Sequence, residues 1–280
     1  MALRSNAADS VQLLDAGVRR RLERFGRWTV DRPAPGAEGF RRLATAAWDA
    51  ADLRFDPAPG VGWSGPPWPV EPWTVAVDGL TLELRPTTSG GVGLYPEHAA
   101  NLPWLTARVG SGGANVLNLF AHTGLATLAL ARAGAAVTHV DGSRTAVAWA
   151  RRNAELSELS DKPVRWIVDD AMAFVAREAR RGRRYDGIVL DPPAFGRGKG
   201  REWRLDADLP ALLDACRAVA SPDAFVLLTA HSEAIDGEDL RAMLADAFRS
   251  KRSTIEVVAM DLTAESGATL SQGWAARLGA

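Results

Sequence analysis

The chain has 280 residues, of which 47% are hydrophobic and 24% charged, which excludes a disordered protein and fits one α/β domain with a smaller accessory piece. The 33 basic and 34 acidic residues give a formal net charge of −1, so any nucleic-acid binding must come from a local basic patch. The single cysteine, Cys216, excludes an intramolecular disulfide and a CxxC metal site, and the four histidines show no paired ligand spacing, so we expect no metal.

The first segment in chain order, Met1 to Ser10, lacks the apolar core of a signal peptide. No apolar run in the sequence approaches the roughly 18 residues that span a membrane. Together with the reduced cysteine, these features predict a cytoplasmic protein without a membrane partner.

The region up to Asn101 is rich in tryptophan, proline and glycine, which interrupt regular structure. Between Val11 and Val30, apolar and polar residues alternate around Asp15-Ala16-Gly17, which predicts a hairpin with its turn at those three residues. Phe40 to Leu53 has the apolar spacing of a helix.

A second hairpin is predicted from Trp73 to Val77 and from Leu80 to Leu84, because the turn signal Asp78-Gly79 joins these two runs. Together with the first hairpin and the predicted helix, it indicates a small α+β domain over residues 1–101.

From Asn115 onwards, short apolar runs alternate with stretches of helix length. The candidate strands are Asn115 to Phe120, Ala136 to Val140, Val164 to Val168, Gly187 to Leu190 and Ala224 to Thr229. This alternation predicts a parallel sheet with helices on both faces. Two further runs, Ile255 to Met260 and Ala268 to Trp274, are separated by too short a turn for a helical crossover, so we expect them to pair antiparallel at the sheet edge.

The first of these strands leads into a turn of small residues, and a helix begins near Gly124. Backbone NH groups at such a turn can approach an anionic or carboxylate ligand. The turn lacks the GxGxxG spacing that a dinucleotide pyrophosphate needs, so a dehydrogenase is the least favoured class. An ordinary strand-to-helix turn without a ligand is the alternative.

Carboxylates follow the second and third strands. Asp141 comes a little under the roughly 20 residues after the glycine turn at which an acidic residue binds ribose hydroxyls. Its alternative role, capping the next helix, can be filled by Ser143. Of Asp169 and Asp170, we expect one to accept the adenine amino group and the other to cap the helix over residues 171–180. These features predict a site for S-adenosylmethionine.

The fourth strand ends in Asp191-Pro192-Pro193-Ala194-Phe195. A carboxylate, carbonyls without a competing proline NH and an aromatic ring can hold a flat, hydrogen-bonding acceptor. The basic, glycine-rich stretch Arg197 to Arg204 follows, which predicts a mobile loop that brings phosphates to the site while Phe195 or Trp203 stacks on a base. A surface loop with no role is the alternative.

These segments resemble the class I S-adenosylmethionine-dependent methyltransferases, and within them the bacterial large-subunit rRNA methyltransferase group that includes cytosine C5 and guanine N7 enzymes. The resemblance rests on Asn115 to Gly124, Val140-Asp141, Asp169-Asp170 and Asp191 to Phe195, and upstream on Gly93 to His98, Leu13 to Asp15 and Leu22 to Gly26. It implies a Rossmann-like seven-stranded core over residues 102–280.

The resemblance also implies roles for single residues. The implied cofactor-binding residues are Tyr95, Asn118, Phe120, Thr123, Gly124, Asp141, Ser143, Asp170 and Asp191. The implied catalytic residues are Asp191, Pro192, Pro193 and Phe195. In this arrangement Asp141 binds the ribose, Asp170 binds the adenine, and Asp191 lies beside the transferable methyl group.

The chain departs from the cytosine C5 members, which carry a nucleophilic cysteine just after the fifth strand. It has Thr229-Ala230-His231-Ser232 there, and Cys216 lies in a helical stretch as a structural thiol. We therefore expect direct methyl transfer to a base nitrogen of RNA, with rRNA favoured, although the additional N-terminal RNA-binding domain of many group members is not expected here. A small-molecule or protein methyltransferase and a non-catalytic cofactor-binding scaffold remain as alternatives, and His122 and His231 are given no catalytic role.

Overall fold

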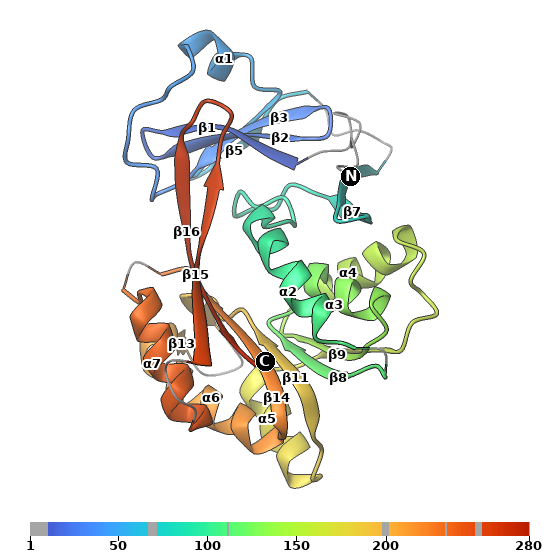
Figure 1. Cartoon of the computed structure of the whole chain (residues 1–280). Coiled ribbons are helices and arrows are strands. Elements are labelled where there is room, and N and C mark those ends of the chain that lie inside the picture. Colours follow the sequence, from blue (N-terminus) through green and yellow to red (C-terminus); the bar gives the residue numbers. More distant parts are fainter. Residues whose placement is uncertain are drawn as a thin grey trace. The chain divides into compact units, whose positions relative to one another are not determined.

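The computed structural model describes residues 11–66, 72–110, 112–197, 202–232, 234–249 and 254–279 (Figure 1). The chain forms two compact units, one of Met1–Ala99 with Asp261–Gln272 and the other of Ala100–Met260 with Gly273–Ala280. The first unit is therefore discontinuous in sequence. No helix among the described residues is both long and apolar enough to cross a bilayer.

The first unit contains a five-stranded sheet of order β1-β2-β3-β4-β5. Its strands are β1 (Val11–Gly17), β2 (Arg20–Phe25), β3 (Trp28–Pro33), β4 (Leu53–Asp56) and β5 (Gly62–Ser64). The turn between β1 and β2 is Val18-Arg19, whose φ angles of 54° and 57° fit a tight hairpin turn. The predicted turn at Asp15-Ala16-Gly17 is wrong, because these residues belong to β1.

The helix predicted over Phe40 to Leu53 is also wrong in most of its length. Only α1 (Thr45–Asp49) is helical, and Leu53 begins β4. The cause is a tertiary contact: the buried Asp15 carboxylate accepts hydrogen bonds from the backbone NH groups of Arg42 and Leu43 and from the indole of Trp48. These bonds hold the chain before α1 in an irregular path.

The second predicted hairpin is confirmed as β6 (Trp73–Val77) and β7 (Leu80–Leu84), which pair antiparallel from Trp73 with Leu84 to Val77 with Leu80. Its turn residues Asp78 and Gly79 have φ angles of 49° and 72°, as this type of hairpin turn requires. A 3₁₀ helix, η2 (Pro96–Asn101), follows and runs from the first unit into the second.

The second unit contains a seven-stranded sheet of order β10-β9-β8-β11-β14-β16-β15. Its strands are β8 (Asn115–Leu119), β9 (Ala136–Asp141), β10 (Val164–Val168), β11 (Tyr185–Leu190), β14 (Ala220–Ala230), β15 (Ile255–Thr263) and β16 (Thr269–Leu278). The first five pair with one another in parallel, and β16 is antiparallel to β14. The predicted Rossmann-like seven-stranded core is confirmed. The C-terminal pair lies at the sheet edge as expected, with β16 placed between β14 and β15.

Helices cover both faces of this sheet (Figure 1). They are α2 (Leu102–Ala107), α3 (Leu125–Arg132), α4 (Arg144–Leu156), α5 (Ala171–Arg180), α6 (Leu205–Val219) and α7 (Gly237–Phe248). Residues of α5, α6 and α7 form one buried apolar cluster with side chains of β8, β11 and β14, whereas α3 and α4 pack on the other face. This packing fixes the carboxyl ends of the parallel strands along one edge.

Candidate active site

The loop after β8 has a backbone conformation that is rare outside functional sites. Phe120, His122 and Gly124 have φ angles of 54°, 47° and 94°, so every second residue is left-handed. A glycine is required at position 124 for two reasons. Other residues are strained at a φ of 94°, and a Cβ atom there would lie 3.0 Å from the Cβ of Ala150 in α4. An alternation of this kind can turn successive backbone NH groups towards a common anion.

Asp141, at the end of β9, ties this loop to the next one. Its Oδ2 accepts a hydrogen bond of 2.9 Å from the backbone NH of His122, and its Oδ1 accepts one of 2.8 Å from that of Ser143. Ser143 takes the capping role, since its Oγ accepts from the backbone NH of Ala146 at the start of α4. The carboxylate is thus fixed in orientation and keeps lone pairs for further donors, as ribose binding needs.

The two carboxylates after β10 have different partners. Asp170 caps α5 by accepting a 2.9 Å hydrogen bond from the backbone NH of Ala173 through Oδ1, and its side chain is exposed. Asp169 accepts from the backbone NH of Asp170 and pairs with Arg177. Capping uses one oxygen of Asp170, so it is compatible with the predicted contact between this residue and adenine.

A buried polar network lies beneath the loop after β8. The Asn118 amide donates to the Thr127 hydroxyl at 2.9 Å, and this hydroxyl lies 2.9 Å from Nδ1 of His139. Burial, followed by the charges of His122 and Arg151, lowers the pKa of His139 to about 3, so its ring is neutral. Asn118 is 2% exposed and therefore faces the interior, where it supports the loop.

Two other residues predicted to bind the cofactor, Thr123 and Phe120, lie in this loop. Thr123 is buried, with its carbonyl accepting from Asn153 of α4 and its Oγ1 3.4 Å from Nδ1 of His122. The ring of Phe120 packs 5.6 Å from that of Trp203. Tyr95 belongs to the first unit, so its contact with a cofactor remains a prediction.

Asp191 follows β11 and receives two donors from β14 and the residue after it. Its Oδ1 accepts a hydrogen bond of 2.5 Å from the hydroxyl of Thr229 and one of 3.1 Å from Nε2 of His231. The Thr229 side chain is 1% exposed, so this bond holds the carboxylate from inside the sheet. The sequence does not predict this contact: His231 is given no catalytic role there, and Thr229 is only the last residue of the expected fifth strand.

The stretch after the two prolines forms a hairpin in place of the predicted loop. Its strands β12 (Phe195–Arg197) and β13 (Glu202–Arg204) pair Phe195 with Arg204 and Gly196 with Trp203. The tip with Lys199 and Arg201 lies outside the described residues.

Directly paired residues share a face, so Phe195 and Trp203 point to opposite faces of the hairpin. Trp203 packs on Phe120 and donates from its indole to the carbonyl of Pro193 at 2.7 Å, whereas Phe195 is 73% exposed. Of the two aromatic side chains considered for base stacking, Phe195 is therefore the accessible one.

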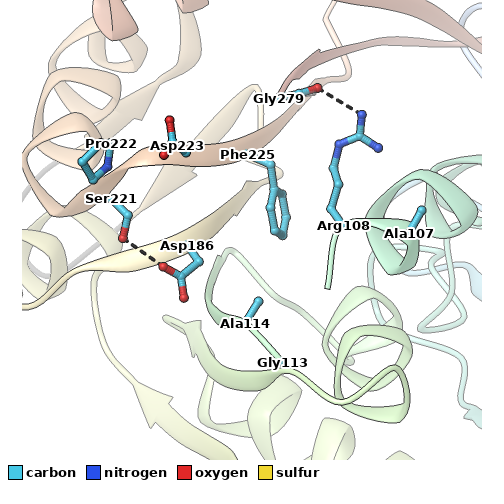
Figure 2. A pocket seen from close by; sticks show the side chains of 10 residues that line it. All are labelled: Ala107, Arg108, Gly113, Ala114, Asp186, Ser221, Pro222, Asp223, Phe225 and Gly279. Atoms are coloured by element: carbon cyan, nitrogen blue, oxygen red, sulfur yellow. Dashed lines mark hydrogen bonds between the residues drawn. The ribbon is translucent and has the colours of Figure 1, made fainter. Parts of the chain in front are cut away.

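A cavity of about 670 Å³ lies elsewhere in the second unit, at the amino ends of β8, β11 and β14 (Figure 2). Two hydrogen bonds of 3.0 Å link polar groups of its lining: Ser221 donates to Asp186, and Arg108 donates to the carbonyl of Gly279. Ligands of open parallel sheets bind at the carboxyl ends. This cavity lies at the opposite ends of the strands, so its position argues against an active site there, whatever its volume.

Comparisons with known proteins agree with this geometry. A family model for S-adenosylmethionine-dependent methyltransferases matches residues 19–255. The crystal structure of a SAM-dependent methyltransferase from Agrobacterium tumefaciens is similar, with a TM-score of 0.90 and 35% identity over 99% of this chain and 92% of that chain.

Two curated relatives are ribosomal RNA large subunit methyltransferases K/L. The protein of Syntrophotalea carbinolica is 40% identical over 115 residues, which cover 41% of this chain and 15% of that protein. The protein of Stutzerimonas stutzeri is 39% identical over 149 residues, which cover 51% and 19%. The match thus spans less than a fifth of either relative.

Proposed function

Because the chain belongs to the S-adenosylmethionine-dependent methyltransferases, we propose that it transfers the methyl group to a base nitrogen of RNA, with ribosomal RNA as the substrate. The observation that carries this proposal is the Asp191 carboxylate, held by two donors and followed by the exposed ring of Phe195. The two relatives named as rRNA methyltransferases support the choice of RNA. Such a substrate also implies a cytoplasmic location.

The residues at the carboxyl edge fit the polar groups of S-adenosylmethionine. We assign the methionine carboxylate to the N-terminus of α3, where no side chain caps the helix at Gly124. The NH groups of Ala121, His122 and Gly124 in the loop before it already donate to Val140, Asp141 and Ala121. Asp141 then accepts from the ribose hydroxyls and Asp170 from the adenine amino group. Ser143 contributes by capping α4 and by holding Asp141 through its backbone NH.

The bound sulfonium supplies an electrophilic methyl group with a neutral leaving group, so the protein has mainly to align the acceptor. Thr229 and His231 fix the rotation of the Asp191 carboxylate, which lets it orient a base through a hydrogen bond. The carbonyl of Pro193 is engaged by Trp203, so we assign the second contact with the base to the carbonyl of Pro192.

A covalent route through cysteine is disfavoured by the state of Cys216. This residue is 0% exposed in α6, and burial raises the pKa of its thiol, so the nucleophilic thiolate does not form near neutral pH. Direct transfer to nitrogen needs no such nucleophile.

The exposed face of the β12–β13 hairpin suits an RNA base and its phosphate. Phe195 and Arg204 are directly paired across the two strands and share that face. Stacking of a base on an aromatic ring contributes about 1–3 kcal/mol. Arg204 forms an exposed ion pair with Asp206. Exposed ion pairs contribute little to stability, so a phosphate can replace Asp206 as the partner of Arg204.

The decisive experiment uses rRNA from cells that lack the protein, S-adenosylmethionine with a heavy methyl group, and mass spectrometry of the nucleosides. The wild type should label one nucleoside on nitrogen. Asp191→Ala should lose this transfer while still binding S-adenosylhomocysteine, and Asp223→Ala, which changes an exposed carboxylate at the opposite sheet edge, should keep it. Labelling of a small molecule or a protein in place of RNA would overturn the RNA assignment.

The same assay tests His231 as a positioning residue for Asp191. His231→Ala should lower kcat about tenfold, the effect of losing one hydrogen bond to a charged group, and leave the cofactor affinity unchanged. His231→Gln restores a donor and should recover part of the rate. A fall in cofactor affinity that matches the fall in kcat would contradict this role.

A further inference from the structure

Phe40, in the first unit, is a second aromatic residue presented to solvent. Its side chain is 92% exposed, more than any other large apolar side chain in the described part of the chain. Arg19 and Arg42 are exposed beside it, and we call these three residues the Phe40 patch.

Backbone hydrogen bonds on both sides of Phe40 hold this residue in an exposed position. On its N-terminal side, the carbonyls of Ala37 and Gly39 accept hydrogen bonds of 2.7 Å from the backbone NH groups of Arg19 and Val18. These bonds join the loop to the turn between β1 and β2, which places Arg19 next to it.

On the C-terminal side, the backbone NH groups of Arg42 and Leu43 donate to Oδ2 of Asp15 at 3.0 and 2.9 Å. The backbone at Phe40 also lies close to Gly17 of β1, because a Cβ atom on Gly17 would lie 2.5 Å from the carbonyl carbon of Phe40. Phe40 is thus held between two anchored points with its ring turned outward.

The neighbouring side chains set the charge of the patch. The Arg41 guanidinium lies 4.0 Å from the centre of the Trp48 ring, so this arginine is turned onto the protein, while Arg42 is exposed. Glu38 is an exposed carboxylate on the same loop. The formal charge of the loop and the adjoining turn is therefore positive.

We propose that the Phe40 patch is an RNA-binding surface, in which Phe40 stacks on an unpaired base and Arg19 and Arg42 contact the flanking phosphates. This inference rests on RNA being the substrate. The chain has a net charge of −1, so it can attract RNA only through local groups of cations. An aromatic ring flanked by arginines suits single-stranded nucleic acid, because every base offers a face for stacking.

A protein partner fits the patch less well. Besides Phe40, the exposed large apolar residue joined to this loop in the described chain is Val18, which is 57% exposed. Two large apolar side chains among charged ones are too few for the core of a stable protein interface. Binding of a second copy of the chain remains an outcome that the experiment distinguishes.

The test measures binding of a single-stranded oligonucleotide from the methylated rRNA region, together with kcat and KM for the rRNA. Phe40→Ala should weaken RNA binding and raise KM about tenfold, as expected for loss of one stacked base. The kcat and the affinity for S-adenosylhomocysteine should not change. Phe40→Trp should retain binding, whereas Phe40→Leu, which lacks a π face, should resemble alanine.

Val61→Ala is the matched control, because Val61 is 57% exposed just before β5, at the opposite edge of the same sheet. It should leave RNA binding unchanged. Arg19→Gln and Arg42→Gln should each reduce the slope of log affinity against log salt by about 1. Glu38→Gln should tighten binding, since it removes a negative charge from the loop.

The outcomes separate this inference from the proposed function. If the wild type methylates rRNA and Phe40→Ala has the same KM and affinity, the RNA surface is overturned and the proposed function stands. If the wild type neither binds nor methylates RNA, both are overturned. If Phe40→Ala changes the oligomeric state and leaves RNA affinity unaffected, the patch binds a second copy.

Discussion

His139 shows how a single buried side chain couples the stability of the second unit to pH. Its pKa is lowered to about 3 by burial, whereas in an unfolded chain a histidine titrates near 6.5. Between these two values the unfolded chain binds a proton that the folded chain does not. The free energy of unfolding therefore falls with decreasing pH, by up to about 1.4 kcal/mol per pH unit from this residue.

We predict that His139→Gln, which cannot take up a proton, weakens this dependence. Urea unfolding at pH 7 and pH 5 should give a smaller difference in free energy for the variant than for the wild type. The comparison uses the change with pH, so a uniform loss of stability in the variant does not affect it. Equal differences for the two proteins would mean that His139 is protonated in the folded state.

The positions of the site carboxylates could be predicted at the scale of single residues, but their partners could not. Asp141, Asp170 and Asp191 each follow a recognisable apolar strand, and parallel strands bring such ends to one edge. That Thr229 and His231 would meet on one oxygen of Asp191 depends on the register between β11 and β14. No local pattern in the sequence specifies that register.

At the scale of elements, the loop after β8 has left-handed backbone angles that are strained for most residues, and it lies close to α4. We predict that Gly124→Ala weakens cofactor binding at least tenfold, because an alanine is strained at a φ of 94° and its Cβ would lie 3.0 Å from that of Ala150. Calorimetric titration with S-adenosylhomocysteine measures the change.

Gly182→Ala is the matched control for this loop. Gly182 also has a positive φ, 66°, but it lies between α5 and β11 and has open space around its Cα. It should lose a similar amount of backbone stability without losing cofactor affinity. If the two variants bound the cofactor equally well, the shape of the loop after β8 would not matter for binding.

Elements set by local sequence were predicted well, and those set by distant contacts were not. The Asp78-Gly79 turn and helix α5 lie where the sequence indicates, because turn chemistry and helical spacing are local. The helix expected over Phe40 to Leu53 is replaced by an irregular path because Asp15, far away in sequence, bonds to its backbone.

At the scale of the whole molecule, the β15–β16 hairpin contributes to the cores of both units. Its tip packs Leu262, Ala264, Ala268 and Leu270 into an apolar cluster with Leu13, Ala16, Ala34 and Ala37. Ser266 in the tip also donates to Oδ1 of Asp15 at 3.0 Å. The stability of the first unit therefore depends on Asp261–Gln272, a segment that follows most of the second unit in sequence.

We predict that Leu270→Ala destabilises the first unit selectively. Leu270 is 1% exposed, and its truncation should cost about 2–5 kcal/mol. Hydrogen exchange followed by mass spectrometry should show faster exchange in β1, β2 and β3, with protection retained in β8 and β11. Equal loss of protection in both units would show that they unfold as one.

The discontinuity of the first unit has a consequence for synthesis of the protein. During synthesis the segment Met1–Ala99 emerges from the ribosome before the second unit, but Asp261–Gln272, which completes the core of the first unit, emerges only after Ala100–Met260. Until then the apolar side chains of β1 are partly exposed to solvent, and exposed apolar side chains favour aggregation and binding by chaperones. The first unit can therefore reach its final packing only after residues 100–260 of the methyltransferase unit have been synthesised.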